Sequence, residues 1–191
     1  MKKIFRPKIM IICNGSVAEP QYFQSFKDFL KIPASIKIIS NSTGSDSPWR
    51  LIERAIKVKG NNNGTEIWCV FDIDQYLENN EVKLRAAFKL AAENGIFLAW
   101  SNICFELWIL LHFIHFNAAC GCCDDYNGKI KQQCQKLGLS YQKNADIFQE
   151  ILPLQTTAIK NAKSIASNKM ETNPSTQVYK LVERLNKLKI S

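Results

Sequence analysis

The 191-residue sequence predicts an α/β protein with a mainly parallel, four-stranded sheet flanked by helices. Two observations predict this class. Short apolar runs, typical of buried strands, alternate with longer amphipathic segments, typical of helices, up to residue 100. Polar residues follow two of the apolar runs directly, at Asn14 and at Asp72. Such alternation favours a sheet of parallel strands that is covered by helices. Proteins with such sheets bind their ligands at the carboxyl ends of the strands.

Turn residues separate the elements of this predicted core. The expected strands are residues 8–13, 35–39, 67–71 and 96–100, and the expected helices between them are residues 19–30, 48–59 and 81–93. Pro20 and Pro48 each fit the first turn of a helix, and Ser47 fits the N-cap position before the second helix. Asn94-Gly95 is typical of a helix C-terminus, so it closes the third.

The chain becomes helical after Cys104. Residues 105–116 are apolar on nearly all sides, which predicts a buried helix. A loop at 120–126 precedes the expected helices, which cover residues 128–137, 145–152, 157–168 and 176–189. The sequence therefore predicts an α/β core over residues 1–115, with a helical C-terminal extension over residues 116–191 packed on it.

The formal net charge of +8 favours a polyanionic partner such as a nucleic acid. Residues 1–115 carry 14 basic and 11 acidic side chains, whereas residues 116–191 carry 11 and 6, so the extension is the more basic part. Lys180, Arg184 and Lys187 line one side of the last helix. A solvated basic surface is the alternative that charge alone leaves open.

The sequence predicts a cytoplasmic protein with no membrane segment. Its longest apolar run contains Glu106 and His112, and its N-terminus lacks the apolar stretch of a signal peptide. Reduced thiols are therefore expected, with Cys13, Cys69 and Cys104 in the core. The other four cysteines, with His112 and His115 upstream, leave open either a zinc site or plain loop cysteines: Cys120, Cys122, Cys123 and Cys134.

Two carboxylates end the third predicted strand. Asp72 and Asp74 are two residues apart, so both can point to one side, where Mg²⁺ between them would relieve their repulsion. An exposed acidic turn is the alternative. Glu106 is the only acidic residue of the buried helix, and it needs a partner, a metal or a proton. The presence of Glu106 is explained equally well by its position in the first helical turn, where the helix dipole favours a negative charge.

Several blocks, taken in chain order, resemble the RloB-like family, which includes abortive-infection proteins of bacteria. The resemblance covers nearly the whole chain, and its most specific blocks are Asn102–Trp108, read Asn-Ile-Cys-Phe-Glu-Leu-Trp, and Asn-Pro-Ser-Thr at 173–176. The other blocks are Cys13-Asn14-Gly15, Glu19-Pro20-Gln21-Tyr22-Phe23, Thr43-Gly44-Ser45-Asp46, Phe71-Asp72-Ile73-Asp74 and His112-Phe113.

The resemblance implies a Toprim-like core, in which a Glu after the first strand and an Asp-x-Asp after a later strand gather Mg²⁺ or Mn²⁺. Asp72 and Asp74 match the Asp-x-Asp, and Glu19 matches the third acid of the family's first motif. Asn14 stands where the leading Glu belongs, and Ser16 and Ala18 also depart from the motif. An amide offers a carbonyl oxygen, but it cannot take up a proton near neutral pH.

The resemblance thus implies a Mg²⁺-dependent nuclease of antiviral defence, impaired by Asn14. Glu19, Asp72 and Asp74 are the expected metal ligands, and Asn102 and Glu106 complete the expected site. The alternative is a non-catalytic nucleic-acid-binding or regulatory subunit, with an ATPase as partner protein. A small-molecule or nucleotide-binding module is disfavoured because no Gly-x-Gly-x-x-Gly is present. The choice between DNA and RNA and the oligomeric state stay open.

Overall fold

The computed structural model describes residues 7–31, 36–41, 46–166 and 169–188, without the side chains of residues 74 and 75. Most of the family block at 43–46 therefore lies outside the described residues. The strands are β1 (Lys8–Cys13), β2 (Ile36–Ile39), β3 (Thr65–Asp72), β4 (Phe97–Asn102) and β5 (Ser175–Thr176). The helices are α1 (Ala18–Leu30), α2 (Pro48–Gly60), α3 (Asp74–Glu93), α4 (Glu106–Phe113), α5 (Cys123–Lys136), α6 (Phe148–Ile151), α7 (Gln155–Ile165) and α8 (Val178–Asn186).

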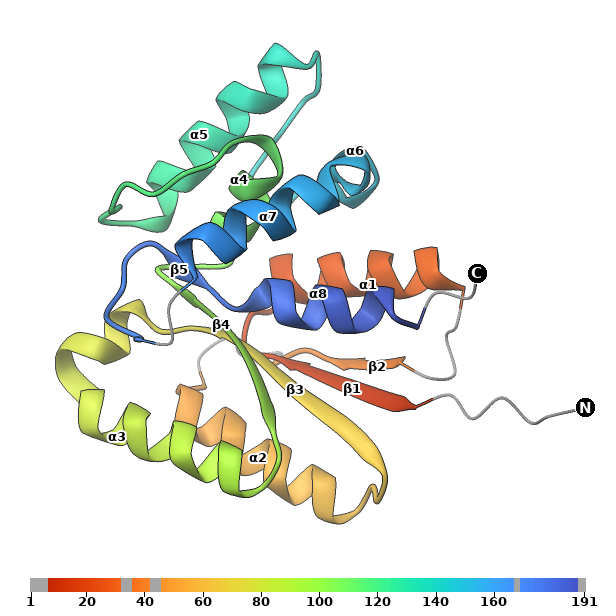
Figure 1. The fold of residues 1–191 in the computed structure, drawn as a ribbon, viewed down its shortest axis with the longest axis vertical. Coiled ribbons are helices and arrows are strands. Elements are labelled where there is room, and N and C mark those ends of the chain that lie inside the picture. Colours follow the sequence, from red (N-terminus) through yellow and green to blue (C-terminus); the bar gives the residue numbers. More distant parts are fainter. Residues whose placement is uncertain (1–6, 32–35, 42–45, 167–168, 189–191) are drawn as a thin grey trace, which may run out of the picture.

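The strands form one sheet in the order β2-β1-β3-β4-β5, in which β1 to β4 are parallel (Figure 1). The predicted four-stranded parallel sheet is confirmed. The fifth strand is an addition, because it runs antiparallel to β4 and pairs Thr176 with Ser101. The sequence prediction of a helix from residue 176 is wrong at its start, since the helix begins at Val178. A strand of two residues is too short to show a periodic pattern.

Helices cover both faces of the sheet (Figure 1). Ile9, Ile11 and Cys13 belong to the apolar cluster that includes α1, α4, α7 and α8, whereas Met10 and Ile12 belong to the cluster with α2 and α3. The alternation follows the strand period of two. Burial on both faces explains why these strands appear in the sequence as unbroken apolar runs. The arrangement is consistent with a Toprim-like core.

Tyr22 on α1 is the centre of an aromatic cluster that holds α4 and α6 against the core. Its ring centroid lies 5.6 Å from that of Phe105, 6.3 Å from that of Trp108 and 5.2 Å from that of Phe148. On the far side of α4, Asn161 of α7 donates a 2.8 Å hydrogen bond to the carbonyl of Leu111. The predicted buried helix is confirmed, although it ends at Phe113 rather than 116, and α5, α6 and α7 pack on it.

Apart from α8 and shifts of a single residue, four helix starts differ from the sequence prediction: α6 begins at Phe148 rather than 145, and three others follow. The first is α5, which begins at Cys123 rather than 128, because Asp124 and Asp125 suit a first helical turn and Gly128 lies within the helix. The second is α3, which begins at Asp74 rather than 81 and contains a non-helical residue, Asn80, at its predicted boundary. The third is α7, which begins at residue 155 rather than 157. No helix among the described residues is long and apolar enough to cross a membrane.

Candidate metal centre

Asn14 and Asp72 leave the sheet at the same edge, on neighbouring strands. Cys13 of β1 pairs with Val70 of β3, and the amide of Asn14 donates to the Val70 carbonyl at 2.9 Å. Asp72 is the last residue of β3, and Asp74 begins α3 two residues later. The side chain of Asp74 lies outside the described part of the chain. The carboxyl edge of the sheet therefore carries the residues that the strand ends predicted.

The side-chain oxygen of Asn14 is buried and has no hydrogen-bond partner among the described residues. Buried acceptors without a partner are uncommon, because they lose their hydrogen bonds to water without replacement. A carbonyl oxygen in this state is a good ligand for a hard cation such as Mg²⁺.

Glu19 closes the turn between β1 and α1. Its side chain is only 4% exposed, and its Oε2 accepts a 2.6 Å hydrogen bond from the amide of Gly15. A Cβ added at Gly15 would lie 2.8 Å from that oxygen, so Gly15 allows the carboxyl group to approach the backbone closely. The turn thus fixes Glu19 next to the end of β1.

Burial raises the pKa of Glu19 to about 8. The Gly15 hydrogen bond opposes this rise, and the negative charge of Glu106 adds to it. Burial also raises the pKa of Glu106. The two carboxyl groups therefore hold protons more tightly than usual, and Glu19 is mostly protonated at pH 7. A bound cation would favour the ionised form of Glu19.

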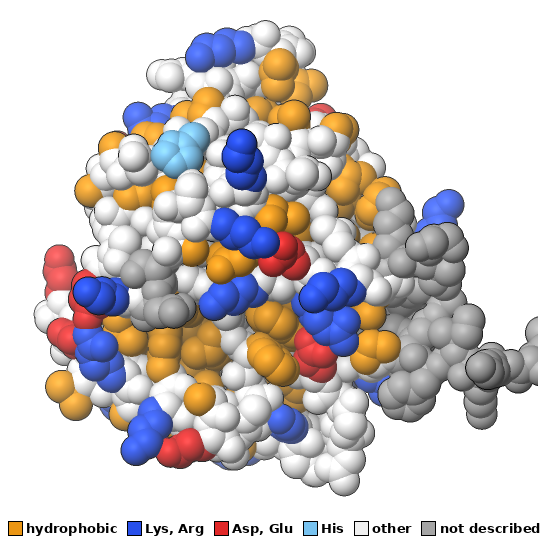
Figure 2. Space-filling model, viewed as in Figure 1, with side chains coloured by type: hydrophobic (Ala, Val, Ile, Leu, Met, Phe, Trp, Pro, Cys, Tyr) orange, Lys and Arg blue, Asp and Glu red, His pale blue; other side chains and the backbone are white. Residues whose placement is uncertain are grey.

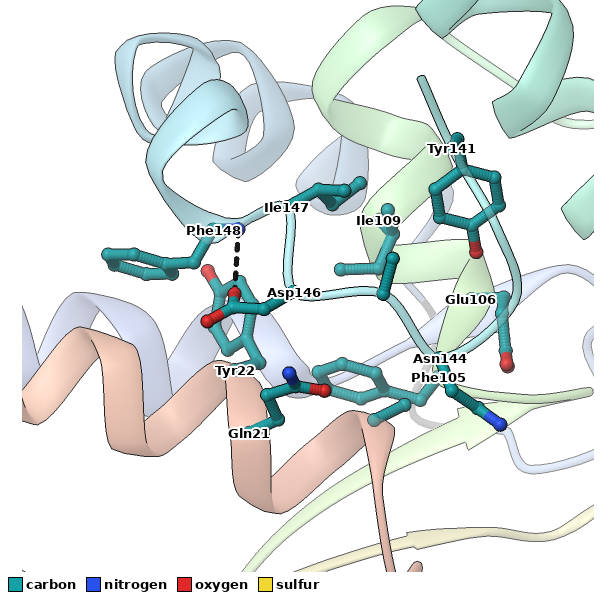
Figure 3. Close-up of a pocket in the computed structure, with 12 residues that line it drawn as sticks. Gln21, Tyr22, Phe105, Glu106, Ile109, Tyr141, Asn144, Asp146, Ile147 and Phe148 are labelled. Carbon is teal, nitrogen blue, oxygen red and sulfur yellow. Dashed lines mark hydrogen bonds between the residues drawn. The ribbon is translucent and has the colours of Figure 1, made fainter. Parts of the chain in front are cut away.

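Glu106 is one of the residues that line a small cleft between α1, the start of α4 and the segment 141–148 (Figure 3). The cleft has a volume of about 30 Å³, which is room for roughly two water molecules. Asp146 holds the segment in place, because its carboxylate accepts hydrogen bonds from Ser25 (2.7 Å) and from the amide of Phe148 (3.0 Å). A nucleotide does not fit this cleft, so a polymeric substrate would have to bind outside it.

Asn102 has a structural contact where the sequence predicted a catalytic residue. It is 4% exposed, and its amide nitrogen donates to the carbonyls of Met170 (2.9 Å) and Thr172 (3.1 Å). These bonds fasten the segment before β5 to the end of β4. The side chain thus holds the C-terminal segment rather than facing Glu19 or Asp72 with its donor group.

We expect Asn102→Ala to lower the free energy of unfolding by ~2–4 kcal/mol, because a buried carbonyl and a partly buried carbonyl lose their donor. Urea denaturation measures this. Asn94→Ala is the matched control, since it removes an amide that bonds only within its own helix, and we expect a loss below ~1 kcal/mol. Unchanged stability combined with lost activity would instead give Asn102 a role in the chemistry.

The Asn-Pro-Ser-Thr block has a similar structural role that the sequence alone did not reveal. The side chain of Asn173 bonds both the carbonyl (2.9 Å) and the amide (3.4 Å) of Cys120. Ser175 and Thr176 form β5, and the hydroxyls of Thr176 and Ser101 lie 2.9 Å apart. The block therefore joins the loop before α5 to the edge of the sheet.

The oxygen donors at the sheet edge fit a hard cation, although they are not fully assembled as a metal centre. Asn14, Glu19 and Asp72 offer only oxygen ligands, which Mg²⁺ and Mn²⁺ prefer. Among the described side chains, which exclude that of Asp74, the set of three metal-ligating groups within 4.8 Å is instead Cys104, Glu106 and Cys123. Binding of Mg²⁺ would thus require Glu19 to lose its proton.

The cysteines differ from the sequence expectation. Cys104 and Cys123 form a disulfide, so the prediction of reduced thiols is wrong for this pair. Of the two alternatives left open for the other cysteines, a metal-ligating group that includes His112 or His115 does not occur among the described residues. His112 is buried in α4, where burial lowers its pKa to about 4, and its Nδ1 lies 3.0 Å from the carbonyl of Trp108.

Comparison with known proteins gives one match. A family model described as RloB-like protein matches residues 9–185, which is nearly the whole chain. No curated protein and no solved structure matches the chain.

Proposed function

Because the chain belongs to the RloB-like protein family, we propose that it is a metal-dependent enzyme that cleaves nucleic-acid phosphodiesters in bacterial antiviral defence. The observation that carries this proposal is the environment of Glu19. A carboxyl group that is 4% exposed and has another carboxyl group nearby is costly for the fold. Carboxyl groups with strongly raised pKa values are frequent at functional sites, where a cation or a substrate makes use of them.

In this proposal Asn14, Glu19 and Asp72 hold Mg²⁺ or Mn²⁺, and Asp74 follows them in the chain. The ion, when bound, stabilises negative charge on the attacked phosphate and orients water. Gly15 holds one oxygen of Glu19 through its amide, and the proposal assigns the other oxygen to the ion. Glu106, whose pKa is also raised, is a second carboxyl group able to hold a proton near the reaction.

A second function is favoured by Asn14. The amide takes up no proton, and it contributes no negative charge to a cation site. A chain with this substitution would retain a phosphate-facing surface without turnover, as a nucleic-acid-binding or regulatory subunit of a defence system that contains an ATPase. Cleavage separates the two functions, because a regulatory subunit binds nucleic acid without cutting it.

The test is a cleavage assay of the purified chain on single- and double-stranded DNA and RNA, with Mg²⁺, Mn²⁺ or EDTA. The enzyme proposal predicts slow cleavage that stops in EDTA and in the Asp72→Ala variant. Binding without cleavage under all metal conditions supports the regulatory subunit. Cleavage that survives in Asp72→Ala contradicts the assignment of the site.

The proposed nucleic-acid contact involves α8, with one change from the sequence prediction. Arg184 is paired with Glu66 of β3 at 2.9 Å, so this guanidinium anchors α8 to the sheet. Lys180 and Lys187 are exposed. Figure 2 shows Lys and Arg side chains spread over the face of α7 and α8, with acidic side chains between them. The two lysines are therefore the candidate phosphate contacts on this helix.

We expect nucleic-acid binding to weaken as the salt concentration rises, because phosphate contacts release counterions. The double variant Lys180→Gln/Lys187→Gln should reduce the slope of log K against log salt by about 2, near one unit for each lost contact. Lys57→Gln/Lys89→Gln, on the opposite helical layer, is the control and should leave the slope unchanged. Equal slopes for both double variants would remove α8 from the interface.

A further inference from the structure

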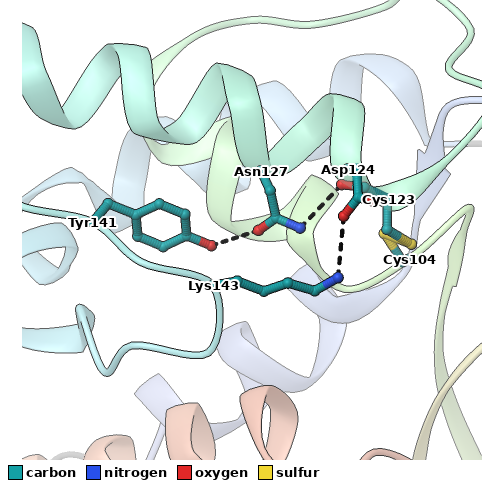
Figure 4. Close-up of polar contacts among 6 residues, drawn as sticks. All are labelled: Cys104, Cys123, Asp124, Asn127, Tyr141 and Lys143. Carbon is teal, nitrogen blue, oxygen red and sulfur yellow. Dashed lines mark hydrogen bonds and ion pairs between the residues drawn. A yellow bond between two sulfur atoms is a disulfide. The ribbon is translucent and has the colours of Figure 1, made fainter.

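Three metal-ligating side chains converge where α4 and α5 begin. Cys104 follows β4 and is buried, Glu106 is the first residue of α4, and Cys123 is the first residue of α5. The two cysteines are 19 residues apart in sequence, and their Cα atoms lie 6.0 Å apart across the disulfide (Figure 4). Both sulfur atoms and a carboxylate oxygen of Glu106 lie within 4.8 Å of one another.

This donor set differs from the oxygen donors at the sheet edge. Two thiolates and one carboxylate suit Zn²⁺, which binds sulfur at about 2.3 Å and oxygen at about 2.0–2.2 Å. Tetrahedral coordination separates neighbouring ligand atoms by roughly 3.5–4 Å. The two sulfur atoms, which are bonded to each other in the disulfide, would therefore move apart once it is reduced, and the Glu106 oxygen is within 4.8 Å of both. Three protein ligands leave a fourth position open to water or to another ligand.

We propose that Cys104, Glu106 and Cys123 form a Zn²⁺ site that is available only when the disulfide is reduced. A phosphine reductant and one water molecule convert the disulfide into two thiols and a phosphine oxide. Zn²⁺ then replaces the two thiol protons, which go to the solvent. Oxidation by a disulfide or a peroxide closes the site again and releases the ion. The chain would thus exchange one crosslink between the starts of α4 and α5 for another.

The surroundings support a charged site at this position. The ligands bring three negative charges against the two positive charges of Zn²⁺. Lys143 and Asp124 both lie near Glu106, and because their opposite charges offset each other, the site keeps about one negative charge. Lys143 is held there by Asp124, at 3.1 Å, and Asn127 fixes the first turn of α5 through the carbonyl of Cys123 (Figure 4). Cys123 also lies at the N-terminus of a 14-residue helix, which favours its thiolate. This proposal does not depend on nuclease activity.

The test uses Co²⁺ as a spectroscopic probe on the reduced chain, after removal of the reductant. We expect one Co²⁺ per chain with a sulfur-to-cobalt charge-transfer band, displaced by Zn²⁺ and absent from the oxidised chain. Cys123→Ser should abolish the band, and Glu106→Gln should keep it while weakening binding about tenfold or more. Cys122→Ser, which changes the exposed neighbouring cysteine, is the matched control and should leave the band intact.

A second measurement needs no variant and so is independent of how the substitutions affect folding. In the reduced chain, Zn²⁺ should protect Cys123 from alkylation, as mass spectrometry detects, while Cys122 remains reactive. The proposal is overturned if the reduced chain shows no charge-transfer band, if Zn²⁺ protects Cys122 rather than Cys123, or if the band survives in Cys123→Ser.

Discussion

The Asn14→Glu variant is expected to cleave nucleic acid ~10²–10⁴-fold faster than the unaltered chain, in the presence of Mg²⁺. Asn14 directly follows β1, the strand next to that of Asp72, and its side-chain oxygen is buried with no hydrogen-bond partner in the described part of the chain. A carboxylate at this position adds a charged ligand and a group that accepts a proton. The rate of cleavage of a labelled oligonucleotide measures the effect.

Two controls accompany this prediction. Asn14→Gln adds length without charge and should stay as slow as the unaltered chain, whereas Asp72→Ala combined with Asn14→Glu should be inactive. Ser16 and Ala18 also depart from the family motif. Adding Ser16→Glu and Ala18→Thr to the Asn14→Glu variant should therefore not reduce its gain in cleavage rate. Rapid Mg²⁺-dependent cleavage by the unaltered chain would show that Asn14 is no handicap, and that Glu19 or Glu106 has the role assigned to the missing acid.

The metal-free chain is expected to lose stability between about pH 4.5 and pH 8 because of Glu19. Its pKa is raised in the fold from 4.5 to about 8, so the neutral form is favoured there. The stability that the neutral carboxyl group of Glu19 contributes to the fold is fully present below pH 4.5 and is lost as the pH rises through 8. Complete ionisation of Glu19 costs on the order of 3–5 kcal/mol. Urea denaturation in EDTA at several pH values measures the free energy of unfolding.

Glu19→Gln should remove most of this pH dependence and should be more stable than the unaltered chain at pH 9. The difference in the free energy of unfolding between the two proteins isolates the effect of Glu19 from that of His112. The pKa of His112 is lowered to about 4, so its contribution to stability is instead lost on acidification. Glu93→Gln, an exposed change, should leave the profile unaltered. An unchanged profile in Glu19→Gln would show that the ionised carboxyl group is compensated in the fold.

The sequence was sufficient to predict the parallel sheet and its polar edge. The apolar runs that became β1 and β3 are buried on both faces, and their polar neighbours Asn14 and Asp72 had to leave the sheet at its carboxyl end. The importance of Glu19, by contrast, came only from the family resemblance. Its burial depends on the turn at Gly15, which no periodic pattern indicates.

Periodic patterns in the sequence do not reveal contacts between residues that are distant in sequence. Asn102 was predicted as a site residue, but its partners Met170 and Thr172 lie about seventy residues later. Cys104 was assigned to the core and Cys123 to a loop, because nothing local shows that the starts of α4 and α5 meet. Arg184 belonged to a predicted basic face, and only the packing of α8 on the sheet brings it to Glu66.

The proposed metal centre is tested best by calorimetric titration of the chain with Mn²⁺, with the disulfide intact, in buffers of different ionisation enthalpy. We expect one bound Mn²⁺ and the release of about one proton at pH 7, supplied by Glu19. Binding should disappear in Asp72→Asn, and Glu19→Gln should bind more weakly without releasing a proton. Mn²⁺ binding that is unchanged in both variants, or no binding by the unaltered chain or by Asn14→Glu, would contradict a metal centre at this edge of the sheet.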